Sequence, residues 1–126
     1  MVRMVLAIAA IFAGLGVAAG AFGAHALKDQ LTERALATFE TGVKYQMYHA
    51  LALFGVAILL SQAELFAPGT LKAAAIAFIV GIVIFSGSLY ALSFTGIKIL
   101  GAITPFGGVA FMVGWGCIAL AALKGS

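Results

Sequence analysis

Charged side chains are scarce in this sequence. Among its 126 residues, seven are Lys or Arg and four are Asp or Glu, so 9% are charged while 64% are apolar. A soluble domain carries about 25% charged residues, and a fold of this size buries only about 65% of the surface that its unfolded chain exposes. These numbers exclude a soluble globular domain and also a disordered chain. The sequence therefore predicts a protein that folds in lipid.

Residues that bind metals or form disulfides are also few. The single cysteine, Cys117, cannot form a disulfide within the chain, and its apolar neighbours predict a small buried side chain rather than a reactive thiol. One cysteine and two histidines cannot supply the four ligands of a structural zinc site. The seven basic residues are scattered, which favours membrane lipids over nucleic acid as their partner. We therefore expect no metal, no cofactor and no nucleic acid.

Long apolar runs predict four membrane spans. A spanning helix needs about 20 apolar residues, so four helices leave room for short connections only. We place the spans at about 4–27, 42–61, 71–94 and 105–123, in one integral membrane domain that comprises residues 1–126. The run Met4–Ala24 is longer than the core of about 7–15 residues in a secretory signal, so we interpret it as a span. We expect Gly96 to end the third span and Pro105, after the N-cap Thr104, to begin the fourth.

The segment from residue 28 to residue 44 differs from the rest of the chain. It contains six charged residues, and these are Lys28, Asp29, Glu33, Arg34, Glu40 and Lys44. Its apolar residues recur at helical spacing, and Asp29 or Thr32 could cap the helix start. The predicted fold is therefore all-α, a transmembrane four-helix bundle with an amphipathic helix between spans 1 and 2. That helix should run into span 2, with a bend at Gly42.

The distribution of basic residues only weakly determines the orientation in the membrane. Four spans place both termini on one side, together with Arg3, Lys72 and Lys124. The other side carries four basic residues, which are Lys28, Arg34, Lys44 and Lys98. The margin of one slightly favours a cytoplasmic location for the amphipathic segment.

Small residues predict close contacts between helices. Span 1 contains Gly16, Gly20 and Ala24 on one helix face, and span 4 contains Ala110 and Gly114 with the same spacing of four. In lipid, such small faces let helix backbones approach closely. The sequence leaves open whether these faces pack within one chain or form a homo-oligomer.

The start of span 2 has the densest group of polar residues. Thr41, Tyr45, Tyr48 and His49 share one helix face, which we expect to point into the bundle because buried polar groups need partners. Ser86, Ser88 and Tyr90 in span 3 are the expected partners. Both histidines should lie toward the same membrane face, with His49 deeper. The candidate ligand-binding residues are His25, Glu40, Tyr45, His49 and Tyr90.

Three interpretations of these polar residues compete. They could hydrogen-bond to neighbouring helices and maintain the packing, which is the ordinary role of such groups in a membrane protein. They could form a site for a small ligand or lipid headgroup, because an ionisable residue within the membrane often marks function. The third interpretation, ligation of a metal or haem by both histidines, finds no support in their separation of 24 residues.

Several motifs, in order, carry a resemblance to a known family. The first two are residues 20–27, GAFGAHAL, and residues 41–53, TGVKYQMYHALAL. They are followed by GSLY at 87–90, TPFGG at 104–108 and GW at 114–115. The chain resembles the domain of unknown function 423 family of small integral membrane proteins, the YgdD/YwdK-like group. The resemblance implies a multi-span protein of the bacterial inner (plasma) membrane, and it implies no activity and no catalytic residue.

Together these patterns predict a small multi-span membrane protein that is not an enzyme and acts through assembly or interaction with a partner. No nucleophile–base or metal-ligand pattern is present in the sequence. The alternative is a minimal transporter, or a membrane protein that binds a small ligand or lipid at a polar site near His25 and His49. Span 1 has no Asp or Glu, which argues against proton-coupled cation export.

Overall fold

A computed structural model of the chain describes residues 1–62 and 64–125. All of its regular structure is helical in these residues. The elements are α1 (Val2–His25), α2 (Glu33–Leu60), α3 (Pro68–Gly81), the π-helical turn η1 (Ile82–Ser86), α4 (Gly87–Thr95) and α5 (Ile99–Lys124). Because α3, η1 and α4 are continuous, they form one rod, and the described chain has four rods of 24 to 28 residues that are apolar enough to cross a membrane. At about 1.5 Å per residue, each rod exceeds the hydrocarbon core of about 30 Å. The predicted four spans are confirmed.

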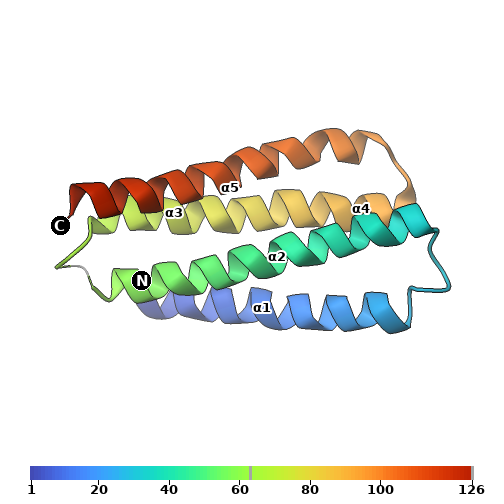
Figure 1. Cartoon of the computed structure of the whole chain (residues 1–126), viewed down its shortest axis with the longest axis horizontal. Coiled ribbons are helices and arrows are strands. Elements are labelled where there is room, and N and C mark those ends of the chain that lie inside the picture. The colour runs from blue at the N-terminus through green and yellow to red at the C-terminus, as the bar shows by residue number, and fades with distance from the viewer. Residues whose placement is uncertain (63, 126) are drawn as a thin grey trace.

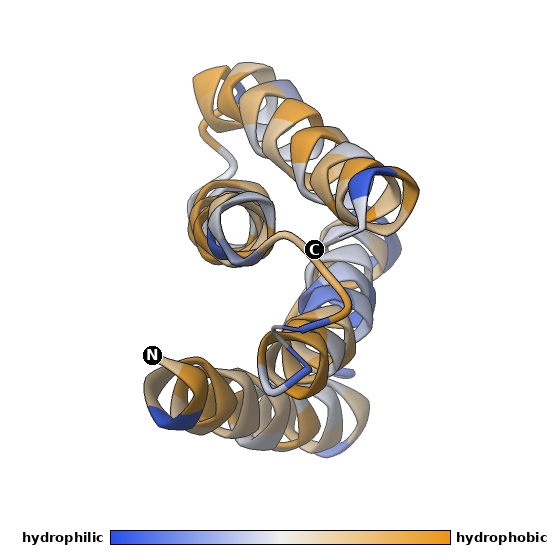
Figure 2. Ribbon diagram, turned by 90° about the vertical axis from the view of Figure 1, so that its left-hand side faces the viewer, coloured by the Kyte–Doolittle hydropathy of each residue, from blue (hydrophilic) through white to orange (hydrophobic). Residues whose placement is uncertain are grey.

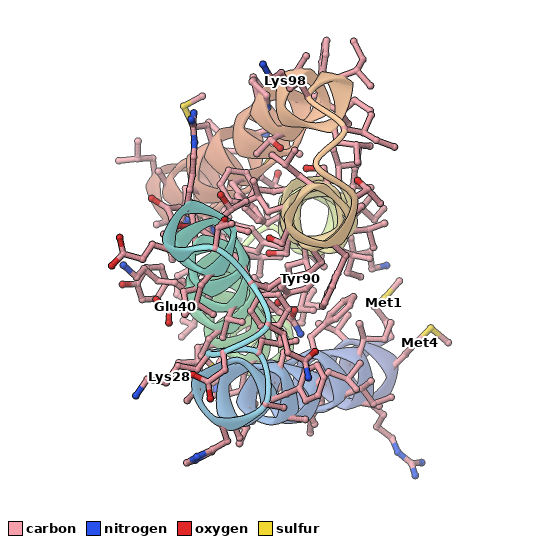
Figure 3. The ribbon with its side chains drawn as sticks, turned by 90° about the vertical axis from the view of Figure 1, so that its right-hand side faces the viewer. Met1, Met4, Lys28, Glu40, Tyr90 and Lys98 are labelled. Carbon is pink, nitrogen blue, oxygen red and sulfur yellow. The ribbon has the colours of Figure 1, made fainter. Side chains whose placement is uncertain are left out.

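The four rods lie side by side and run alternately up and down (Figure 1). Both termini are at one end, and the connections that follow α1 and α4 are at the other end. The outer helices are α1, which packs on α2, and α5, which packs on α3, η1 and α4. Figure 3 shows α1 and α5 at opposite edges, with α2 and α4 between them. The contact between α2 and the α3–η1–α4 rod therefore joins the two halves of the molecule.

Apolar side chains occupy both the interior and the outer surface. Leu53, Leu71 and Phe78 are fully buried in the core. Many large apolar side chains point outward, for example Ile11, Val83 and Met112 at 59–67% exposure. Hydrophobic colours accordingly dominate the rods in Figure 2. A surface of this kind matches acyl chains rather than water, in agreement with the composition.

The predicted amphipathic helix is not a separate element. The charged residues from Glu33 onward form the first turns of α2, which continues through Gly42 to Leu60. Thr32 is the N-cap, as one of the two expected candidates, and its Oγ1 accepts a hydrogen bond of 3.1 Å from the Ala35 N–H. The helix is not interrupted at Gly42, and the bend expected there stays a prediction. This glycine allows a close approach, because a Cβ there would lie 2.8 Å from Tyr90 Cε1.

The helix α5, which contains the predicted fourth span, begins at Ile99, six residues before the expected helix start at Pro105, so Pro105 lies inside α5. Thr104 is therefore not an N-cap. Its Oγ1 donates a hydrogen bond to the Leu100 carbonyl oxygen at 3.3 Å. The same Oγ1 is 2.5 Å from Ser88 Oγ of α4. The helix satisfies backbone polar groups of residues 99–103, and membrane helices tolerate an internal proline where neighbouring groups compensate.

The third rod has two local features that determine its fit against its neighbours. Its end was predicted correctly, since Gly96 adopts the left-handed conformation (φ 70°, ψ 10°) and its N–H donates to the Leu92 carbonyl. Its middle contains the π-helical turn η1, where α5 approaches very closely. A Cβ on Gly107 would lie 2.5 Å from the backbone nitrogen of Phe85. The backbones of α5 and η1 can therefore meet only because residue 107 has no side chain.

Candidate functional site

Gln46, in the middle of α2, connects three of the four rods. Its side chain is buried, with 5% exposure. Its Nε2 donates to the Phe12 carbonyl oxygen of α1 at 2.8 Å, and its Oε1 accepts from the Tyr90 hydroxyl of α4 at 2.6 Å. In Figure 3, Tyr90 lies in the space between α4, α2 and α1. An amide in hydrocarbon needs such partners, so these bonds hold the helices at defined positions.

His49 lies one turn further along α2 and makes two hydrogen bonds of its own. Its Nδ1 is 2.8 Å from the Tyr45 carbonyl oxygen, and its Nε2 is 3.1 Å from Trp115 Nε1 of α5. A carbonyl oxygen only accepts and an indole N–H only donates, so the geometry defines a neutral imidazole that is protonated at Nδ1. The ring also stacks on Phe111 with a centroid distance of 3.5 Å. Both ring nitrogens are therefore occupied within the chain.

Hydroxyl groups complete the network between helices. Ser86 Oγ, in η1, donates to the Gly42 carbonyl of α2 at 2.7 Å, and Ser88 of α4 bonds to Thr104 of α5. Among the described residues, every buried polar side-chain atom has a hydrogen-bond partner. The polar interior therefore stabilises the fold and has few unpaired groups available for chemistry.

The structure brings together some of the predicted site residues. Tyr45 and His49 are neighbours, with ring centroids 6.1 Å apart. Tyr90 reaches the same region but bonds to Gln46. The His25 side chain, at the end of α1, is exposed, as is Glu40. The contacts of His49 described above are with Tyr45, Phe111 and Trp115, and they do not link it to His25.

The inward face of α2 also differs from the predicted one. Tyr48 is 54% exposed, and Thr41 Oγ1 donates to the Ala37 carbonyl of its own helix. The buried residues of this part of α2 include Gly42, Gln46 and His49, and of these only His49 belongs to the predicted face. The spacing of polar residues defined a face, but the rotation of the helix depends on packing against neighbours that the spacing does not reveal.

Sequence reasoning did not single out Gln46 or Trp115 as partners in this network. A signal for Gln46 was available, since an uncharged amide within an apolar span has to be paired and lies three residues from His49. The acceptor on α1 carries no signal, because it is a backbone carbonyl that any residue at position 12 would supply.

A groove of about 420 Å³ runs beside the Gln46–Tyr90 pair. Its walls include Phe12 and Leu15 of α1 and Val83 of η1, and Ser86 contributes to its polar part. A pocket lined jointly by Tyr45, His49 and Tyr90 would have indicated transport or ligand binding. Of these three residues, Tyr90 lines the groove.

The fold and this network define a class of protein: a small integral membrane protein with four helical spans and an interior polar network that connects them. The comparisons with known proteins agree. Residues 19–108 match a family described as protein of unknown function (DUF423), and the chain belongs to this family. The resemblance found in the motifs is thereby confirmed.

Relatives in several bacteria match nearly the whole chain. The UPF0382 membrane protein YwdK of Bacillus subtilis is 49% identical over 122 residues, which cover 97% of this chain and 98% of the relative. The UPF0382 inner membrane protein YgdD of Escherichia coli is 34% identical over 97% of this chain and 91% of its own length. No solved structure matches the chain. The chain is a multi-pass protein of the bacterial inner membrane.

Proposed function

We propose that this protein is not an enzyme and that it acts by assembling with a second copy of itself in the membrane. The observation that carries the proposal is an exposed face of small residues on α1. This face consists of Ala7, Ala10, Gly14, Ala18 and Ala21. The paired polar interior supports the non-enzymatic part, since its hydrogen-bonding groups serve the contacts between helices.

The two glycines of the small face predicted on span 1, Gly16 and Gly20, are already covered by α2 of the same chain. A Cβ on Gly16 would lie 3.3 Å from Met47 Cε, and one on Gly20 would lie 3.4 Å from Val43 Cγ1, both in α2. Gly14 lies on the opposite side of α1, and a Cβ there would have nothing within 4 Å. An oligomer formed through small residues would therefore use the outward face rather than the predicted one.

The outward face of α5 provides a contrast. It carries large side chains, for example Phe106 and Met112 at 70% and 67% exposure. Bulky apolar side chains suit contact with acyl chains, whereas small ones allow a second helix to approach and gain van der Waals contact. A symmetric contact through α1 would use the same face of both copies, which is the common arrangement of homodimers.

We also infer how the four-helix bundle sits in the bilayer. The charged first turns of α2, residues 33–41, lie in the headgroup layer, and the apolar remainder of the helix spans the hydrocarbon. This placement is supported by the charges of Glu33, Arg34 and Glu40, which would be costly to bury in acyl chains.

Replacement of Gly14 by leucine tests the assembly. We expect native mass spectrometry to detect dimers of the wild-type protein and monomers of Gly14→Leu, because the side chain would keep the two α1 backbones apart. Gly116→Leu is the matched control, since a Cβ on this α5 glycine also has nothing within 4 Å and the helix-propensity change is the same. It should remain dimeric. A monomeric wild-type protein, or a dimeric Gly14→Leu variant, would contradict the proposal.

Binding of a small amphiphile is a second candidate function, and the 420 Å³ groove beside Gln46 and Tyr90 is the observation that favours it. Its walls are mainly apolar and Tyr90 and Ser86 lie at its polar part, which suits a ligand with an apolar body and a hydrogen-bonding group. The same mass spectra distinguish the two candidates. Ligand binding would be favoured over assembly if the wild-type protein is monomeric and retains a small molecule. Val83→Trp, which fills the groove, should then abolish the retention.

A further inference from the structure

A second cavity, of about 520 Å³, lies at the end of the bundle where the α4–α5 connection meets the first turns of α2. It is separate from the Gln46–Tyr90 groove and from the outward face of α1. Arg34 lines it from α2, and Lys98 lines it from the connection. Figure 3 views the molecule from this end, with Lys98 near the start of α5. The fold therefore brings together two basic residues that are 64 positions apart in the sequence.

These two positive charges have no counter-charge in the cavity. No acidic side chain is found among the lining residues that the structure describes. Glu33 and Glu40 are seven residues apart and so share a face of α2. Neither of them lines the cavity. Two basic residues that line one concave surface, with no carboxylate in its described lining, form a site that favours an anion.

The polar groups of the cavity also include hydroxyl oxygens. Thr38 Oγ1 donates to the Arg34 carbonyl at 3.0 Å, and Ser93 Oγ donates to the Leu89 carbonyl at 2.7 Å. Each hydroxyl proton is therefore used by its own helix, and the oxygen lone pairs remain as acceptors. Such acceptors repel a bare phosphate but can bind an alcohol group attached to one.

The surroundings of Lys98 place the cavity at the boundary of the hydrocarbon. Its sequence neighbours Ile97 and Ile99 are 52% and 67% exposed, so the connection carries exposed apolar side chains on either side of residue 98 in the chain. A lysine in this setting keeps its stem along apolar surface and extends its charge into the headgroup layer. Leu92 adds an apolar wall to the cavity. These features fit an amphiphile better than a free ion.

We propose that this cavity binds the headgroup of an anionic phospholipid that carries hydroxyl groups beside its phosphate, as in phosphatidylglycerol. Arg34 and Lys98 bind the phosphate, and the oxygens of Thr38 and Ser93 accept hydrogen bonds from the headgroup hydroxyls. Basic pockets between membrane helices are suited to such lipids. The proposal goes beyond assembly through α1, because it concerns a basic cavity between α2 and the α4–α5 connection rather than the uncharged face of α1.

The test uses delipidated full-length protein in non-ionic detergent, titrated with phosphatidylglycerol and followed by native mass spectrometry. The double variant R34Q/K98Q should bind about 25-fold more weakly than the wild type, since each basic side chain near an anionic headgroup contributes about fivefold. The control K28Q/K44Q removes the same charge from the same end of the molecule, outside the cavity lining. It should lose less than about twofold. If the double variant cannot be purified, R34Q and K98Q should each lose about fivefold.

Three further outcomes decide the proposal. Phosphatidylcholine should bind much more weakly than phosphatidylglycerol, because its headgroup has no net negative charge and no hydroxyl groups. Inorganic phosphate should not compete at millimolar concentration, and competition there would show a free-anion site and overturn the lipid assignment. An equal loss of affinity in R34Q/K98Q and K28Q/K44Q would overturn the cavity itself, because it would indicate attraction by overall charge.

Discussion

Gln46 makes hydrogen bonds to helices on both sides of α2, and His49 makes one to a third neighbour, α5. In water these hydrogen bonds could be replaced by bonds to solvent. Among acyl chains no solvent is available, so each lost partner leaves an unsatisfied polar group. Neither residue is charged in the observed arrangement, so the interior contains dipoles rather than ions. At the residue scale, the protein is therefore stabilised by a few neutral hydrogen bonds between helices.

A double-mutant cycle on Gln46 and Tyr90 measures one of these bonds. Tyr90→Phe removes the donor and leaves Gln46 Oε1 unpaired, so we expect a loss of about 1 kcal/mol in the free energy of unfolding. Gln46→Leu should cost more, because it also removes the bond to the Phe12 carbonyl. The combined variant should cost less than the sum of the two, with a coupling of about 1 kcal/mol. Unfolding in sodium dodecyl sulfate, followed by circular dichroism, provides the measurement, and strict additivity would contradict the bond.

At the scale of the element, glycines determine how closely the helices approach. Gly81 and Gly107 lie at the contact of the third rod with α5, where a Cβ on Gly81 would clash with the Phe111 ring. The π-helical turn η1 lies at this contact and presents Ser86 to α2 and the Phe85 backbone to Gly107. A π-turn within an apolar helix changes the helical register, so successive residues reach different neighbours.

Gly107→Ala tests this close approach. Because the added methyl group would meet the backbone of Phe85 rather than a flexible side chain, η1 and α5 must move apart. We expect a destabilisation of about 1–3 kcal/mol in sodium dodecyl sulfate unfolding. Gly116→Ala adds the same methyl group to an open position of the same helix and should leave the stability unchanged or slightly increased. Equal stability of the two variants would show that the helices are not in close contact at residue 107.

At the scale of the whole molecule, α1 and α5 are the two outer helices, and α2 and the α3–η1–α4 rod pack against each other between them. α1 is attached through α2, and α5 is attached through the α3–η1–α4 rod, so both outer helices have wide lipid-facing surfaces. One end of the molecule carries both termini and the other carries the connections after α1 and α4 (Figure 1). The basic residues at the two ends differ by one, four against three.

The topology predicts that both termini face the same side of the membrane. From the excess of one basic residue at the opposite end, we expect the termini to lie outside the cytoplasm and the residues around Lys28 and Lys98 to lie within it. Reporter fusions that are active only in the cytoplasm should therefore be inactive at either terminus and active when inserted after Asp29. Termini on opposite sides would contradict a fold with four spans.

Local and compositional features of this protein were predictable from its sequence. The four spans follow from long apolar runs, because any such run must form a helix in lipid. The left-handed Gly96 and the two candidate N-caps, of which the structure uses Thr32, follow from the chemistry of neighbouring residues, which acts over one helical turn. The family was also predictable, because its motifs are short and occur in a fixed order along the chain. Each of these features depends on interactions within a short stretch of chain.

Other features were decided by contacts between helices. The helix α5 begins before Pro105, and its Thr104 side chain bonds to Ser88 of α4. The rotation of α2 turned Gln46 inward and left Tyr48 exposed. The cavity between Arg34 and Lys98 exists because α2 meets the α4–α5 connection at the same end. The sequence alone determined which segments are helices in a membrane, whereas the tertiary structure decided which side chains meet, because helix rotation and neighbour choice depend on packing summed over distant residues.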